Sequence, residues 1–570
     1  MTPLPNELAR LIEAAIRAAQ AAGDLPPFEV LPVDVRPSKR ADQGDYYAAV
    51  MALAKPAKMN PFHIATQIAH HLQKPAFIGS LDVVHPGYLN FRLDKDWLKL
   101  QVETILKKGD AFGALTVGAG KRAQVEFVSA NPTAPLHIGR SRGAIVGDTM
   151  ARLLEAAGYT VEREYYFNNA GAQMRNLGNS LRIRYLEALG RPVKLTDAER
   201  ETFYQGEYLA EFARQLVAEQ GDAWADADWQ PFKAYAEQKM FEMIRATLAR
   251  IDIHHDVYFN ENSLYDSGAI WEVLNALEAR GYIYRAARPE TGEVDETADD
   301  TGKGEAVWFR SSRFGDSKDR VMVKSSGEPT YTLPDIAYHV NKLERGFDLC
   351  VNVLGADHYT QHQVVKHGIK ALGLDADKIR VIIVQLVALM RQGEVVRMSS
   401  RRGDFETLDD LIDQTSPDAV RYVLLARSSD THLNFDLDLA VKQSNENPVY
   451  YIQYAHVRCA GIFREAAARG VTDEDADLRL LGDEELRFLR KALELSEVID
   501  QAVQFLEPHR IAFYALELAH LFHPIFDTVR VLHSEVPPDL ARARLRFFRA
   551  AQAVFKRVLG LMGMSAPEVM

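Results

Sequence analysis

Cysteine is nearly absent from this sequence. Only Cys350 and Cys459 occur in 570 residues, and they lie far apart in the chain. Two distant cysteines cannot build a disulfide framework or a cysteine-rich zinc module. We therefore expect a reducing compartment and no protein-bound zinc or other metal site.

Long apolar runs are absent as well. The first residues, MTPLPNELARLIEAAIRAAQ, form an amphipathic helical pattern that contains Glu and Arg, whereas a signal peptide has an uninterrupted apolar core. No apolar run reaches the ~18 residues that a membrane-spanning helix needs. These absences predict a cytoplasmic protein without a membrane partner.

An excess of positive charge is also missing. The formal net charge is −12, so the chain would have to concentrate Lys and Arg on one face in order to bind RNA. Composition alone therefore favours an enzyme that acts on a small molecule. Two groups of arginines would allow such local concentration: Arg397, Arg401 and Arg402 in one loop, and Arg542, Arg544, Arg546 and Arg549 along one late helical pattern.

The length predicts several domains, because 570 residues, 47% of them hydrophobic, exceed what one core usually holds. Residues 1–110 mix helical and strand patterns, which predicts an α+β domain, and residues 441–570 contain helical patterns only, which predicts an all-α helical bundle. The expected N-terminal elements are helices at Leu8–Ala22 and Pro61–Leu72 and strands at Ile78–Val84 and Tyr88–Leu93. The expected C-terminal helices are Val449–Ala468, Asp483–Phe505, Arg510–Val529 and Asp539–Met562, the last with Asp539 as its N-cap.

Residues 111–440 have the alternation of an α/β domain. A strand at Gln124–Val128, a helix from about Arg142 to Ala157 and a strand at Val161–Tyr166 form a βαβ unit, which requires a parallel sheet. Strand patterns return at Leu349–Val353 and Val381–Leu386. We expect a Rossmann-type domain, with the helical stretches between these strands as insertions.

The loop NPTAPLHIGRSRG, residues 131–143, joins the first of these strands to its helix. Its prolines and glycine favour a rigid loop that a ligand can approach closely. The helix start is a natural anion site, where His137 and Arg140 would add a donor and a cation for nucleotidyl transfer. The loop lacks the GxxxxGK[ST] pattern of a P-loop. The alternative is that His137 only caps the helix.

The segment VVRMSSRRGDFETLDDL, residues 395–411, combines serines, a glycine and three arginines. Arginine binds phosphate through two parallel hydrogen bonds, so this loop could clamp a triphosphate. A run of charges is also often a solvated surface loop, which is the alternative.

Together the two segments resemble the HIGH and KMSK motifs of class I aminoacyl-tRNA synthetases, in the same order and fold context. Further blocks narrow the resemblance to the arginyl-tRNA synthetases, and they extend over essentially the whole chain. These blocks are QGDYYAAVMALAK, PGYLNFRL, VEFVSANPTAPLHIG, RGAIVGD, EREYYFNNAGAQM, VWFRSSRFGDSKDRVMVKSSGEPTYTLPDIAYH, VLGADHYTQHQ, SPDAVRYVLL, NPVYYIQYAHVR and VLGLMGMSAPEVM.

The resemblance implies an arginine–tRNA ligase that uses ATP, with Mg²⁺ accompanying the nucleotide, to activate L-arginine and to esterify it onto the terminal 2′-OH of tRNA(Arg). It also implies a monomer, an activation step that needs bound tRNA, and no editing domain. Two rivals remain. Other class I synthetases carry an editing insertion or a zinc site, and an inactive paralogue that only binds tRNA is supported solely by the residues at Arg140 and Ser400.

Site residues follow from the family's motif positions, and most lie in the two loops. The implied catalytic residues are His137, Arg140, Arg397, Ser399, Ser400 and Arg401. The implied ATP-binding residues are Pro135, His137, Gly139, Arg140, Asp357, His358, Met398 and Ser399.

A guanidinium presents five donors in a plane and stays charged, so its pocket needs carboxylates and carbonyls. The implied arginine-binding residues are Glu126, Asn131, Tyr331, Asp335, Asp357 and Gln361, with Asp335 pairing with the guanidinium. Taken alone, Asp335 is more often a helix cap or a surface charge. The implied tRNA-binding residues are Tyr450, Tyr454, His456 and Arg458, although helical period alone favours a core position for the two tyrosines.

The sequence departs from the family pattern at three places. Arg140 replaces the last His of HIGH, Ser400 replaces the second Lys of KMSK, and Asn169 stands where Asp is usual. We expect Arg401 or Arg402 to supply the missing charge.

Overall fold

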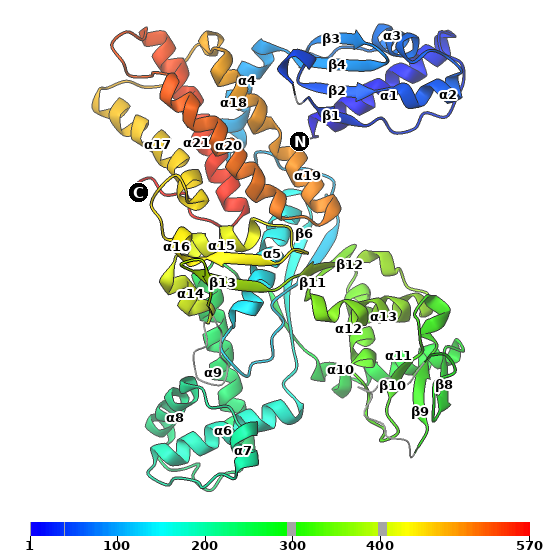
Figure 1. The fold of residues 1–570 in the computed structure, drawn as a ribbon, viewed down its shortest axis with the longest axis vertical. Coiled ribbons are helices and arrows are strands. Elements are labelled where there is room, and N and C mark those ends of the chain that lie inside the picture. The colour runs from blue at the N-terminus through cyan, green and yellow to red at the C-terminus, as the bar shows by residue number, and fades with distance from the viewer. Residues whose placement is uncertain (1, 39, 293–303, 397–406) are drawn as a thin grey trace. The chain divides into compact units, whose positions relative to one another are not determined.

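The computed structural model describes residues 2–38, 40–292, 304–396 and 407–570 (Figure 1). It divides into two compact units. One comprises Met1–Ala119, Ala156–Gly158 and Lys442–Met570, and the other comprises Gly120–Glu155 and Tyr159–Val441. The predicted domain limits at 110 and 440 stay a prediction.

The N-terminal part of the first unit is an antiparallel sheet with helices. Its sheet has the order β1-β2-β4-β3, and the strands are β1 Val35–Pro37, β2 Tyr46–Ala49, β3 Ile78–Val84 and β4 Tyr88–Leu93. Helix α1 (Leu4–Ala22) buries Leu8, Ile12 and Ile16, which lie one helical turn apart. It packs against α3 (Pro61–His71) and against the sheet edge. The α+β class predicted for this part is confirmed.

The C-terminal part of the first unit is helical, as predicted. Its long helices are α17 Pro448–Ala468, α18 Asp483–Leu493, α19 Leu495–Phe505, α20 His509–Thr528 and α21 Pro538–Leu561. The single helix expected over Asp483–Phe505 is wrong, because the chain turns at Glu494, where its N–H donates to the carbonyl of Lys491 at 3.2 Å. Asp539 is not the N-cap of α21, because the helix already begins at Pro538 and Asp539 pairs with Arg542 in the first turn.

The arginines of α21 are engaged in ion pairs. These pairs join Arg542 to Asp539, Arg544 to Glu485, Arg546 to Glu103 and Asp473, and Arg549 to Asp473. Glu103 lies on α4 (Lys95–Lys108), which packs against α18 and α21. This group therefore holds the helices together, and it is not the unpaired basic face that the sequence allowed.

The second unit contains a five-stranded parallel sheet within the described residues. Its order is β12-β11-β5-β6-β7, and the strands are β5 Arg122–Glu126, β6 Thr160–Phe167, β7 Val257–Asn260, β11 Leu349–Gly355 and β12 Ile379–Val384. Numbered along the chain this order is 5-4-1-2-3, which matches five of the six strands of the Rossmann order 3-2-1-4-5-6, so the predicted fold class is confirmed. The strand order reverses between β5 and β11. In open α/β sheets, ligands bind beyond the carboxyl ends of the strands at this switch point.

Long insertions separate these strands. The segment between β6 and β7 contains the helices α6 Gly171–Ala188, α7 Asp197–Thr202, α8 Glu207–Gln220 and α9 Trp229–Arg250. The segment between β7 and β11 contains α10 Asn262–Asp266, α11 Ala269–Ala279, α12 Thr332–Glu344 and an antiparallel sheet of β8 Ile283–Ala286, β9 Ala306–Phe309 and β10 Arg320–Val323. The predicted insertions are thus present, and α12 and α13 (Tyr359–Ala371) lie side by side (Figure 1).

A smaller sheet and two helices complete this unit. The strands β13 Val387–Arg391, β14 Glu394–Val395 and β15 Leu433–Asp436 form the order β14-β13-β15. The helices α14 Leu408–Gln414 and α15 Pro417–Leu425 lie between β14 and β15 in the chain, and α5 (Ile138–Ala156) follows β5.

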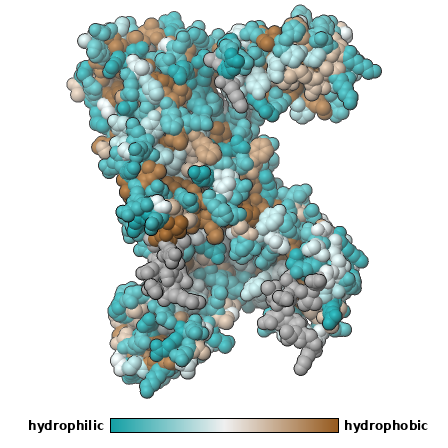
Figure 2. Space-filling model, viewed as in Figure 1, coloured by the Kyte–Doolittle hydropathy of each residue, from teal (hydrophilic) through white to brown (hydrophobic). Residues whose placement is uncertain are grey.

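Hydrophilic side chains cover most of the face seen in Figure 2, with apolar residues scattered between them. Among the residues that the structure describes, no helix is both long and apolar enough to cross a membrane.

Candidate active site

The segment NPTAPLHIGRSRG lies at the switch point: residues 131–137 belong to the loop after β5, and residues 138–143 form the start of α5. The ring of His137 accepts at Nδ1 a hydrogen bond from the N–H of Gly139, at 3.0 Å. His137 therefore does cap the helix, as the alternative interpretation held. The same bond places the proton of the neutral ring on Nε2. Burial lowers the pKa of His137, so this ring is neutral near pH 7. Arg140 follows in the first turn, and it is exposed.

The second loop ends against the first. Arg397, Met398, Ser399, Ser400, Arg401 and Arg402 lie outside the described residues. The chain resumes at Thr407, which forms an isolated antiparallel bridge with His137. The N–H of Leu408 donates to the carbonyl of Leu136 at 2.8 Å. Thr407 also caps α14 reciprocally with Asp410. The segment that follows the second motif is thus anchored beside the histidine of the first.

Asp335 lies in the first turn of α12 and is partly buried. The side-chain amide of Gln361, on α13, donates a hydrogen bond to its carboxylate. Burial, followed by the negative charge of Glu261, raises the pKa of Asp335 to about 7. Asp335 is therefore neither a helix cap nor an ordinary surface charge. Tyr331, four residues earlier, is 79% exposed and stands at the start of the same helix.

Glu126 and Asn131 lie on the other side of this site, at and beyond the end of β5. Glu126 is buried, and its Oε2 accepts from Nζ of Lys342 at 2.6 Å while Oε1 accepts from Oγ of Ser129 at 3.0 Å. Asn131 is exposed, and its Oδ1 accepts from the backbone N–H of Asn168 at 3.0 Å. The carboxylate of Glu126 is thus already held by an ammonium group of the protein.

Glu261 is a third carboxylate that sequence reasoning missed. It follows β7 directly, it is buried, and its Oε2 accepts from the hydroxyl of Tyr166 at 2.7 Å. The charges of Asp335, Glu261 and Glu126 all raise the pKa of Tyr166. Glu261 thus contacts the Tyr166 hydroxyl directly, and the charges of the other two carboxylates also act on it, which is an environment suited to a cation. The one signal in the sequence is the position of Glu261 at a strand's carboxyl end.

The GADH segment completes the switch point from the side of β11. Asp357 and His358 lie in a short 3-10 turn, Ala356–His358, directly after that strand. Their side chains form a pair with 3.5 Å between Nε2 of His358 and Oδ2 of Asp357, and Asp357 is mostly exposed. Pro135 lies in the loop after β5, and Gly139 lies in the first turn of α5. Both segments thus follow the carboxyl ends of two adjacent strands, β5 and β11, where the strand order reverses.

Three family models match the chain in series. They are "Arginyl tRNA synthetase N terminal domain" at residues 6–93, "tRNA synthetases class I (R), catalytic domain" at residues 101–435 and "DALR anticodon binding domain" at residues 452–570. The chain belongs to the arginyl-tRNA synthetase family. It is accordingly a class I aminoacyl-tRNA ligase, whose substrates are an amino acid, ATP and a tRNA.

Individual relatives agree with this assignment. The synthetase is 41% identical to the arginine–tRNA ligase of Carboxydothermus hydrogenoformans over 97% of both chains. It is 42% identical to that of Salinibacter ruber over 97% of this chain and 98% of the other. The Thermus thermophilus arginyl-tRNA synthetase has the same fold, with a TM-score of 0.74, 21% identity, and coverage of 99% of this chain and 100% of that chain.

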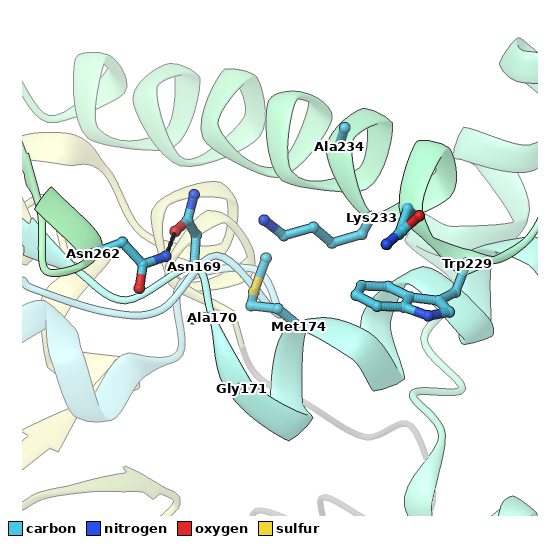
Figure 3. A pocket seen from close by; sticks show the side chains of 9 residues that line it. Asn169, Ala170, Gly171, Met174, Trp229, Lys233, Ala234 and Asn262 are labelled. Carbon is cyan, nitrogen blue, oxygen red and sulfur yellow. Dashed lines mark hydrogen bonds between the residues drawn. The ribbon is translucent and has the colours of Figure 1, made fainter. Parts of the chain in front are cut away.

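A cavity of about 470 Å³ adjoins the amino-acid side of the synthetase's candidate site (Figure 3). It lies between the start of α6 and the start of α9, and its lining includes Met174, Trp229 and Lys233. Asn169 and Asn262, which line its near end, are hydrogen-bonded to each other, and Asn262 follows Glu261 in the chain. Among the residues that the structure describes, none of those predicted to bind ATP or arginine lines it, so this cavity is a neighbour of the predicted site.

The residues predicted to bind tRNA lie on α17 of the DALR domain. Tyr450, Tyr454 and Arg458 are partly exposed and follow one another at intervals of one helical turn. The two tyrosine rings stack at 5.6 Å, and the Arg458 guanidinium lies 4.8 Å from the Tyr454 ring centroid. The core position that helical period favours for the tyrosines is therefore not realised. His456 is buried, with its Nδ1 2.8 Å from the carbonyl of Pro567.

Proposed function

We propose that this synthetase activates L-arginine with ATP and transfers it to the 2′-OH of the terminal adenosine of tRNA(Arg). The observation that carries the choice of amino acid is the group of three carboxylates, Asp335, Glu261 and Glu126, whose charges all act on Tyr166. A neutral amino acid offers no charge to balance these groups. A guanidinium offers one charge and five donors. Asp335 and Glu261 receive this guanidinium, and Glu126 and Asn131 hold the α-amino end.

The activation step is an in-line attack of the arginine carboxylate on the α-phosphorus of ATP. A new O–P bond forms, the bond to pyrophosphate breaks, and arginyl-adenylate results. No protein nucleophile is required, because positioning and charge stabilisation suffice. Neutral His137 donates through Nε2–H, Arg140 and the helix start add positive charge, and Arg397 and Arg401 bind the pyrophosphate end. Mg²⁺ that arrives with ATP neutralises the remaining phosphate charge.

Transfer then consumes the adenylate. The terminal 2′-OH of the tRNA attacks the adenylate carbonyl, its proton is lost, and AMP leaves as an ester of arginine and tRNA forms. Tyr450, Tyr454 and Arg458 contact unpaired anticodon bases, which stack on aromatic and guanidinium planes. His456 instead holds the C-terminal tail by its bond to Pro567, so its part in binding tRNA is indirect.

Arginine-dependent exchange between ATP and pyrophosphate tests the proposal, measured for each amino acid with and without total tRNA. We expect exchange with arginine alone, and only in the presence of tRNA. Exchange with a different amino acid would overturn the assignment of the pocket. Binding of tRNA without exchange under any condition would instead identify Arg140 and Ser400 as marks of a lost active site.

Three further properties complete the proposal. The protein acts as a monomer in the cytoplasm. Residues 1–110 contact the outer corner of the tRNA, residues 111–440 carry catalysis and residues 441–570 read the anticodon. Sedimentation of the purified protein with and without tRNA checks the first of these.

A further inference from the structure

We propose that Lys342 is a positioning residue for the amino-acid site: with Asn352 and His339 it fixes the spacing between Glu126 and Asp335. This inference rests on the proposed function, because it concerns the pocket that we assign to arginine. None of the three residues belongs to a sequence motif of the two loops.

Helix α12 docks on the parallel sheet through a polar stripe. Asp335, Tyr338, Lys342 and Arg345 are spaced by three, four and three residues, so they share one face of the helix. On the sheet, Asn352 of β11 is the register partner of Glu126 of β5, and Glu126 is the partner of Glu164 of β6. Three polar residues thus form a row across adjacent strands. Most helix–sheet contacts are apolar, so this stripe needs an explanation.

The stripe and the row are joined by hydrogen bonds. Tyr338 donates to Oε1 of Glu164 at 2.5 Å, and Arg345 donates to Oε2 of Glu164 at 2.6 Å. Lys342 donates to Oε2 of Glu126 at 2.6 Å and to Oδ1 of Asn352 at 2.7 Å. These contacts hold the helix at a defined height and rotation on the sheet.

The bonds continue from Lys342 to the start of the helix. The ring of His339 lies 2.7 Å from the backbone carbonyl of Asp335 through Nδ1 and 2.6 Å from Nδ2 of Asn352 through Nε2. A carbonyl only accepts, so Nδ1 carries the proton and Nε2 accepts from Asn352. Asn352 therefore turns its Oδ1 toward Lys342, in agreement with the observed bond. The ammonium of Lys342 thus begins a series of hydrogen bonds that ends at the backbone carbonyl of Asp335.

The buried position of Lys342 indicates a structural or an electrostatic role. Its side chain is 0% exposed, and a buried ammonium is costly unless it is paired. Its nearest carboxylate is the one assigned to the arginine α-amino group, and its hydrogen-bonded chain reaches the residue assigned to the guanidinium. These two ends of the substrate must be held at a fixed separation for the carboxylate to reach ATP. Lys342 contacts neither end of the substrate, but it positions the residues that bind both ends.

The ammonium also counters repulsion in the empty pocket. It lowers the pKa of Asp335, which burial and two carboxylates raise. The titratable groups that act on Asp335 come from several elements, namely β5, β6, α10 with the residue before it, and α12 itself. They are Glu126, Tyr166, Glu261, Tyr265 and Lys342. Removing Lys342 should therefore favour protonation of the carboxylates at neutral pH and weaken arginine binding there.

The test compares K342M with R421M in tRNA aminoacylation, with arginine and ATP varied separately. Methionine keeps the length of lysine and removes its charge. Arg421 is a matched control, because it is a buried cation of the same unit that pairs with a buried carboxylate, Asp148 of α5, which is not among the residues assigned to arginine. Wild-type arginylation is measured first. If the wild type does not arginylate tRNA, the proposed function fails rather than this inference.

For K342M we expect the KM for arginine to rise about 10-fold or more, with the KM for ATP changed by less than about 3-fold. Raising the pH from 7 to 8.5 should restore part of the arginine affinity, because it ionises the carboxylates again. R421M should lower the melting temperature without either effect. Equal changes in both KM values, or a pH response shared with R421M, would overturn the inference.

Asn352→Leu provides a second arm in case K342M does not fold. This change keeps the pair of Lys342 and Glu126 and removes the two hydrogen bonds of Asn352, one from Lys342 and one to His339. We expect the KM for arginine to rise about 3-fold to 10-fold with little change for ATP. A wild-type ratio of the two KM values in N352L would show that the chain to His339 has no positioning role.

Discussion

The backbone N–H of Leu408 donates a hydrogen bond to the carbonyl of Leu136, with 2.8 Å between nitrogen and oxygen. Leu136 precedes His137 in the first motif, and Leu408 stands just after the second. The described chain therefore re-enters the fold after the second motif directly beside His137 of the first.

We predict that Arg401 or Arg402 supplies the positive charge that Ser400 does not. Replacing both by alanine should lower the kcat of arginine-dependent exchange about 100-fold, because a group that stabilises charge in the transition state is lost. Exchange of pyrophosphate into ATP measures this effect. Arg280→Ala, which removes one exposed arginine of the same unit, is the control and should retain activity. Unchanged exchange in the double variant would falsify the prediction.

The pKa of about 7 for Asp335 predicts a pH dependence of arginine binding. The carboxylate pairs with the guanidinium only when it is ionised. The KM for arginine should therefore fall by up to about 10-fold per pH unit as the pH rises toward 7, and level off above 8. D335N should remove this dependence and raise the KM about 100-fold, because a charged hydrogen bond is lost. Initial rates measured at varied arginine concentrations between pH 6 and 8.5 test this prediction.

The raised pKa of Asp335 also predicts how the stability of the folded state depends on pH in the absence of arginine. The folded state binds this proton more tightly than the unfolded chain, whose Asp has a pKa near 3.8. The stabilising contribution is thus fully present below 3.8 and is lost as the pH rises through about 7. Melting temperatures of the wild type relative to D335N should decline over this interval. A constant difference from pH 4 to 8 would contradict the assigned pKa.

Glu261 and Tyr166 allow a graded test of the pocket. E261Q should raise the KM for arginine about 10-fold or more, because the substrate loses one of its carboxylate partners. Y166F removes only the hydroxyl that donates to Glu261, so its effect should be smaller, about 3-fold. Isothermal titration of arginine in the presence of tRNA measures both. If Y166F is the more damaging change, Tyr166 rather than Glu261 contacts the substrate.

The sequence predicts local features of this molecule well and distant pairings poorly. The strands Ile78–Val84 and Tyr88–Leu93 occur within the predicted bounds, because apolar alternation and flanking turns are local signals. The break at Glu494 has no such signal, since neither Gly nor Pro marks it. Lys342 and Glu126 are 216 residues apart, and no pattern in either segment indicates their contact.

The residues of the candidate site likewise fall into two groups, those that the sequence indicates and those that it does not. His137, Asp335 and Asp357 could be named because they lie in short recognisable blocks. Glu261 could not, since its role depends on β7 lying next to β6 and on the hydroxyl of Tyr166. The ion pairs of Arg544, Arg546 and Arg549 on α21 could not be predicted, because their carboxylate partners come from α4, α18 and the loop after α17. Sequence alone does not show which charges are already paired.

The row of Tyr450, Tyr454 and Arg458 on α17 predicts that a change there weakens tRNA binding and leaves amino-acid activation unaffected. Arg458→Ala removes a guanidinium plane that lies over Tyr454 and near Phe526, so the KM for tRNA should rise about 10-fold, since one stacked base contributes about 1–3 kcal/mol. The KM for arginine at saturating tRNA should stay constant, because the variant leaves the catalytic unit unchanged. His456→Asn offers the contrast: it disturbs the contact with Pro567 in the buried tail, so it should lower the melting temperature more than it affects tRNA. A larger loss of tRNA affinity in the His456 variant than in the Arg458 variant would show that the buried face, with the tail, carries the recognition instead.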